Sequence, residues 1–148
     1  MRQRIHQFMR ALFGRLDAKG HDFVRSYLSS AEQKLFYDMH AADQYHAFRV
    51  ALTAQELYTE HEHMDTAEYL LLTRCALLHD IGRTKGTADI WGKVLAVLLY
   101  RFVPSAIPYF TRVKDSRRIR GRIGMALYVY VSHPYIGADK LRAIGAMK

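Results

Sequence analysis

The sequence predicts an all-α fold, because helix-capping signals are dense and no stretch alternates polar and apolar residues as a strand does. Counting the caps gives roughly seven to nine helices, packed as an irregular bundle. The chain has 148 residues, of which 50% are hydrophobic and 24% charged, enough for one domain with a proper core. We divide it into an N-terminal helical extension, 1–29, and a helical domain, 30–148, which together form one compact unit.

Capping signals place the helices of the first half. A capping box at 30–33 begins one helix, and Asp43 is a favourable N-cap for the next, which runs to about residue 60. A box-like start at 65–68 opens a helix over 69–79, and Gly82 supplies its C-terminal stop. This helix has almost no polar face, which is typical of a helix at the centre of a bundle.

Prolines divide the second half. A helix over 87–101 carries an apolar stripe, and Pro104 and Pro108 interrupt the segment after it. Another helix spans 116–132 and ends at Pro134, so that a separate amphipathic helix completes the chain. No apolar stretch reaches the roughly 20 residues of a membrane span.

The composition restricts setting and partners. A single cysteine, Cys75, excludes an intramolecular disulfide framework and favours a reduced, cytoplasmic setting. The net charge is +8, and much of the surplus lies in the run 112–122. Such a run attracts phosphate, as free nucleotide, nucleic acid or anionic lipid headgroup, or else it is a solvated basic connection between helices. It lacks the interleaved aromatic residues of a dedicated single-strand nucleic-acid surface.

The adjacent His79 and Asp80, at the end of the apolar helix, are the most informative residues. An imidazole and a carboxylate are ligand types that hold a divalent metal. Neighbouring side chains on a helix point in different directions, but they can converge where the last turn unwinds. An isolated charge at a buried helix end is costly. The pair therefore predicts a metal site or an internal ion pair.

Other histidines are candidate partners of this pair. His46 is the best, because it lies one turn into a capped helix on a face that we expect to turn inward. His133 stands where the helix pattern breaks at Pro134, a corner that can face the same cavity. His61 and His63 alternate in a charged link, where we expect solvent exposure.

The order of these motifs resembles the HD superfamily of metal-dependent phosphohydrolases, closest to its small bacterial members with the signature His-Asp-Ile-Gly-Lys. The resemblance extends from about Ser30 to the C-terminus. The residues that carry it are His46 in the segment Asp-x-x-His-Ala-x-Arg-Val-Ala, the run His79-Asp80-Ile81-Gly82-Arg83, and the His-Pro-x-x-Gly segment 133–137.

The resemblance implies an HD-type helical domain that binds a divalent ion, with Mn, Fe, Ni, Co and Mg as the candidate metals. The implied ligands are His46, His79 and Asp80. His133 is the implied ligand of a second ion, as in members that bind two.

The resemblance also implies the reaction, which is hydrolysis of a nucleotide or other phosphoester by a metal-activated water. The protein would act as a phosphodiesterase or phosphomonoesterase on a phosphate-containing small molecule. Asp80 would bridge metals or orient the water. Arg83, with Lys85 or Arg49, would neutralise the phosphate.

The chain departs from the family pattern after the His-Pro segment. Family members continue for a further helix or two, which bring the last metal-binding Asp. Here residues 139–148 remain, and Asp139 stands at an ordinary helical position. We therefore expect the fourth ligand to be lost or to lie beyond a truncated sequence, and we expect exposed core to favour a homo-oligomer.

Two other functions stay open. A non-catalytic module of the same fold would use 94–110 and the basic run to contact a partner or an anionic membrane surface. A nucleic-acid-binding protein would use 112–122, and its affinity would fall steeply with salt.

Overall fold

The computed structural model describes residues 14–59, 65–86 and 119–146, with five single residues between them: Leu99, Phe102, Val103, Ser105 and Pro108. Within these residues the fold is all-α, as predicted, with five helices and no strand. The helices are α2 (Ala18–Tyr27), α3 (Ser30–Tyr37), α4 (Ala41–Thr59), α5 (Thr66–Leu78) and α8 (Ile119–Ala143). None of the helices in the described part of the chain is long and apolar enough to cross a membrane. Of the helix expected over 87–101, every residue except Leu99 lies outside the described residues.

The capping box of α3 begins one residue earlier than predicted. The Ser29 hydroxyl accepts a hydrogen bond from the Glu32 amide, and the Glu32 carboxylate accepts one from the Ser29 amide. Glu32 prevails over Gln33 as the partner because its negative charge favours a helix N-terminus. Its carboxylate also pairs with Arg74 of α5 at 2.6 Å. Gln33 instead donates to the Leu28 carbonyl.

The starts of α4 and α5 differ in how well the sequence predicts them. Asp65 is the N-cap of α5, as expected, and its carboxylate accepts from the amides of Ala67 and Glu68. Asp43 is not the N-cap of α4, because the helix already begins at Ala41 and Asp43 is buried in its first turn. A carboxylate in the first turn favours the helix in either place, so the signal marks the turn and not the cap itself.

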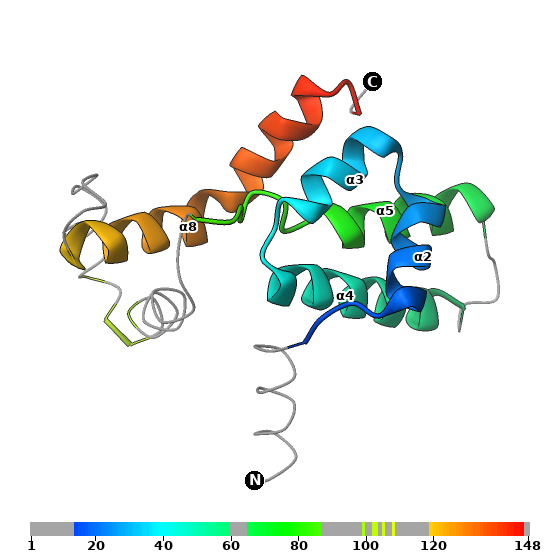
Figure 1. Cartoon of the computed structure of the whole chain (residues 1–148), viewed down its shortest axis with the longest axis horizontal. Helices are drawn as coiled ribbons and strands as arrows, with labels where there is room; N and C mark the ends of the chain where they lie inside the picture. The colour runs from blue at the N-terminus through cyan, green and yellow to red at the C-terminus, as the bar shows by residue number, and fades with distance from the viewer. Residues whose placement is uncertain are drawn as a thin grey trace, which may run out of the picture.

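The core lies between α4 and α5, which run side by side in opposite directions (Figure 1). Its largest fully buried apolar side chains include Phe36, Met39, Leu77 and Ile81. Val24 of α2 belongs to the same core, so the described part of the N-terminal extension packs with the domain.

The prediction that α5 is buried all round is wrong. Ala76, Leu77 and Leu78 at its end are buried, whereas Leu70 is 45% and Leu71 57% exposed. Apolar composition alone therefore overstates how much of this helix the core covers. The buried end is the one that carries the candidate metal ligands.

Helix α8 continues through Pro134, where the sequence predicts a break. A proline inside a helix removes one amide donor and bends the axis rather than always ending the helix. The two halves of α8 do run in different directions (Figure 1). Lys140, in the second half, donates to the Ile81 carbonyl in the loop after α5. Contacts of this kind hold the second half in place, so the helix stays continuous at the proline.

Candidate metal centre

The loop 79–86 carries the candidate ligands away from the end of α5. His79 is the C-cap of α5, and the turn is closed by a hydrogen bond from the Arg83 amide to the Asp80 carbonyl at 2.9 Å. Gly82 is not a left-handed helix stop, because the positive-φ glycines among the described residues are Gly86 and Gly145. A Cβ at Gly82 would instead collide with the backbone carbonyl of His133. Glycine is needed here for close contact between the loop and α8.

Contacts from α8 and from the α3–α4 connection hold this loop in place. The Lys140 ammonium of α8 lies 3.0 Å from the Ile81 carbonyl oxygen to which it donates. Lys85 donates to the Tyr37 carbonyl through its ammonium at 2.7 Å and to the Asp38 carbonyl through its amide at 2.9 Å. The ammonium of Lys85, expected to neutralise phosphate, is thus engaged in anchoring the loop.

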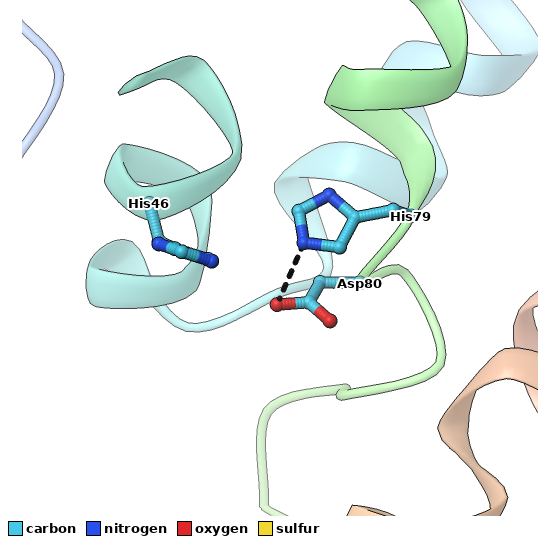
Figure 2. Close-up of side chains that lie close together, drawn as sticks. All are labelled: His46, His79 and Asp80. Carbon is cyan, nitrogen blue, oxygen red and sulfur yellow. Dashed lines mark ion pairs between the residues drawn. The ribbon is translucent and has the colours of Figure 1, made fainter. Parts of the chain in front are cut away.

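His46, His79 and Asp80 lie together although they come from different parts of the chain. Each offers one ligand atom, and these three atoms lie within 4.8 Å of one another. His79 Nε2 is 3.3 Å from Asp80 Oδ2, and the rings of His46 and His79 are 5.5 Å apart at their centres. Figure 2 shows His46 reaching from α4 toward the pair. The His46 and His79 side chains are exposed, whereas Asp80 is buried.

His133 approaches Asp80 through the other carboxylate oxygen. Its Nε2 is 3.3 Å from Asp80 Oδ1, and its side chain is 17% exposed. The helix does not break at this point, so His133 reaches the centre from inside α8 and not from a corner. Asp80 therefore has an imidazole facing each of its two oxygens.

The two imidazoles that face Asp80 are held in the same way, each with its Nδ1 against a backbone carbonyl. His79 Nδ1 is 2.8 Å from the Ala76 carbonyl, and His133 Nδ1 is 2.7 Å from the Tyr130 carbonyl. A carbonyl only accepts hydrogen bonds, so both Nδ1 atoms carry the proton. In the neutral rings the Nε2 lone pairs then face the carboxylate. A backbone carbonyl that fixes a histidine in this way is the usual support of a metal-binding imidazole.

The Asp80 carboxylate is charged and incompletely satisfied. Burial would raise its pKa, but the neighbouring His79, Arg83 and His133 together outweigh burial and lower the pKa of Asp80. The nearest guanidinium nitrogen of Arg83 is 3.1 Å from Oδ2. Both carboxylate oxygens are nevertheless buried without a hydrogen bond of normal geometry. Such orphaned acceptors are costly unless a cation or water meets them.

The pKa values of the two exposed histidines are shifted in opposite directions. Desolvation by its neighbours lowers the pKa of His46, against the opposing effect of the Asp80 charge. The interaction with Asp80 raises the pKa of His79, although burial acts in the other direction. His46 is therefore neutral near pH 7, which is the form that binds metal.

The donor set fits a small divalent ion. Nitrogen and oxygen ligands lie about 2.1 Å from such an ion, so opposite ligands are at most about 4.2 Å apart. The separation of up to 4.8 Å between ligand atoms requires a contraction of roughly half an ångström, which exposed side chains permit. Two imidazoles and a carboxylate suit Mn, Fe, Ni or Co better than Mg, the fifth of the expected metals, because Mg prefers oxygen ligands.

Two further residues that the sequence analysis considered lie away from the ligands or beside them, and one group was missed. Arg49 is exposed on α4, one turn after His46. Asp139 pairs with Arg142 at 2.6 Å on the exposed side of α8, in keeping with an ordinary helical position. The role of the Tyr130 carbonyl was missed. The sequence does carry a signal for it, because Pro134, four residues later, has no amide hydrogen to donate to this carbonyl.

The segments behind the alternative functions lie largely outside the described residues. Of 94–110 the structure describes the five single residues, and of 112–122 it describes the backbone from Ile119 onward. No protein-family model matches the chain, and neither does any curated protein or solved structure.

Proposed function

We propose that this protein is a metal-dependent phosphohydrolase whose divalent ion is held by His46, His79 and Asp80. One observation carries the proposal: residues from α4 and from the end of α5 bring three ligand atoms within 4.8 Å of one another. The buried Asp80 oxygens that lack hydrogen bonds support it, because an ion supplies the missing partner. The Ala76 carbonyl supports it further by holding His79 Nε2 as a ligand.

The residues around the ligands suit a phosphoester substrate. When bound, a divalent ion supplies a Lewis acid that polarises a phosphoryl group and makes water nucleophilic near neutral pH. The exposed His46 and His79 leave the outer side of the centre open to substrate. Arg83 adds a permanent positive charge beside Asp80, and Arg49 adds another on the same helix as His46.

The test combines metal content with hydrolysis of generic substrates. The purified protein is supplemented with Mn²⁺, its metal is counted by elemental analysis, and it is assayed on bis(p-nitrophenyl) phosphate, p-nitrophenyl phosphate and nucleotides. We expect turnover that EDTA abolishes and that His79→Ala and Asp80→Asn lower by more than about 100-fold, because losing a ligand costs more than losing its support. The substrate that is turned over separates a diesterase from a monoesterase.

A histidine outside the centre is the matched control. His21 is half-buried and contacts the Tyr37 hydroxyl at 3.0 Å, so His21→Ala should retain both metal and activity. Wild-type protein that stays free of metal after supplementation, with unaltered stability in His79→Ala, would contradict the proposal. Salt-sensitive binding to RNA or anionic vesicles without turnover would favour the non-catalytic alternatives instead.

A further inference from the structure

The guanidinium of Arg83 bridges Asp80 and His133. One of its terminal nitrogens is 3.1 Å from Asp80 Oδ2, and the other is 3.3 Å from His133 Nε2. His133 Nε2 is itself 3.3 Å from Asp80 Oδ1. Asp80, Arg83 and His133 thus form a cluster in which each side chain contacts the other two.

The cluster of Asp80, Arg83 and His133 requires a positive charge. His133 Nδ1 donates to the Tyr130 carbonyl at 2.7 Å, so Nε2 of the neutral ring is an acceptor. An acceptor nitrogen and a carboxylate oxygen 3.3 Å apart repel each other unless a cation or donor lies beside both. A divalent ion would supply this charge, and the guanidinium also supplies one, through its contacts with Asp80 Oδ2 and His133 Nε2.

Arg83 is held firmly in this position. It follows Asp80 by three residues within one turn, and its amide donates to the Asp80 carbonyl at 2.9 Å. Its guanidinium carbon lies 5.9 Å from the centre of the Tyr130 ring, within the range of a cation–π contact. A guanidinium carries donors on both terminal nitrogens, so one Arg83 side chain can contact both neighbours.

We infer that Arg83 fills the position that a second ion would otherwise take between Asp80 and His133, so that the centre binds one divalent ion and not two. The inference rests on the proposed function for the first ion, at His46, His79 and Asp80. The first position is completed by two imidazoles, those of His46 and His79, whereas the group formed by Asp80 and His133 already contains the guanidinium. A divalent ion added between Asp80 and His133 would be repelled by the guanidinium charge that already contacts both side chains.

The experiment counts Mn²⁺ bound per chain by native mass spectrometry and by elemental analysis after gel filtration. We expect one ion in the wild type and two in Arg83→Met. Arg83→Gln, also neutral but able to hydrogen-bond, should likewise bind two and guards against misfolding of Arg83→Met. Circular dichroism and thermal melting check that each variant is folded. The matched control is Arg142→Met, which breaks another Asp–Arg pair spaced by three residues on the exposed side of α8 and should leave one ion.

A second set of variants tests the position of Arg83 in protein that lacks the first ion site. His46→Ala should lose the ion, His46→Ala/Arg83→Met should bind one, and adding His133→Ala should remove that ion again. Two ions in the wild type, or none in folded His46→Ala/Arg83→Met and His46→Ala/Arg83→Gln, would overturn the inference. The proposed function fails separately, through a wild type that binds no ion, whatever the arginine variants do.

Discussion

At the scale of single residues, the ring of His133 depends on the proline after it. Pro134 has no amide hydrogen, so position 134 donates nothing to the Tyr130 carbonyl four residues earlier. The His133 ring donates to that carbonyl instead, at 2.7 Å. The proline therefore fixes the proton on Nδ1 and leaves Nε2 to face Asp80 and Arg83.

Pro134→Ala should separate stability from ring orientation. The alanine amide can bond to the Tyr130 carbonyl, so the free energy of unfolding should rise by up to about 3 kcal/mol. The His133 ring then loses its exclusive acceptor, and long-range ¹H–¹⁵N NMR of the metal-free protein should show a mixture of both neutral tautomers. His133→Ala assigns the signals. A ring that keeps its proton on Nδ1 in Pro134→Ala would refute the role given to the proline.

At the scale of elements, α3 is tied to α5 by a single buried carboxylate. Glu32 is 1% exposed, completes the capping box with Ser29, and pairs with Arg74 at 2.6 Å. Burial would raise the pKa of Glu32, but the hydrogen bonds from Arg74 and Ser29 outweigh it and lower the pKa. The folded state thus favours the charged form of Glu32.

This preference predicts a loss of stability in acid. A lowered folded pKa contributes stability that is complete above the unfolded pKa of about 4.3 and is lost as pH falls through the folded pKa. Glu32→Gln should cost about 1–3 kcal/mol at neutral pH, measured by urea unfolding. The difference between wild type and variant should shrink between about pH 5 and pH 3.

Glu68 provides the matched control for this prediction. It stands at the same third position of α5 but is exposed, so Glu68→Gln should change the stability much less. Equal effects of the two substitutions at all pH values would contradict the importance of the buried pair. The comparison removes the contribution that any first-turn carboxylate makes to a helix N-terminus.

The sequence predicted these elements only as far as local chemistry determines them. Asp65 was identified as a cap because its partners, the amides of Ala67 and Glu68, lie within the next three residues. The box at Ser29 was placed one residue late because either of two adjacent serines satisfies the pattern. The choice follows the charge of Glu32, whose carboxylate also pairs with Arg74, a residue distant in sequence. Pro134 was taken as a helix end because the local pattern does not show what compensates for its missing amide hydrogen. The His133 ring donates to the Tyr130 carbonyl in its place, and α8 packs on the loop at Gly82.

At the scale of the whole molecule, the candidate centre joins three segments that are far apart in the chain. His46 comes from α4, Asp80 follows α5, and His133 comes from α8. Their residue types and order suggested the grouping. The placement of Arg83 against His133 could not be predicted, since it depends on how close α8 comes to Gly82.

Because the proposed ligands come from separate helices, ion binding should stabilise the entire fold. The unfolded chain cannot hold His46 near Asp80, so the ion binds the native state selectively. At a free Mn²⁺ concentration of 100 times Kd, the gain is about 2.7 kcal/mol. For a chain of this size the gain corresponds to an increase in Tm of about 5–10 °C.

Differential scanning calorimetry with and without Mn²⁺ measures this increase directly. His46→Ala should abolish the shift, because it disconnects α4 from the ion while leaving the pair after α5 in place. His21→Ala should keep it. If Tm rises equally in His46→Ala, the ion binds elsewhere on the chain, and α4 is not linked to the end of α5 through a metal.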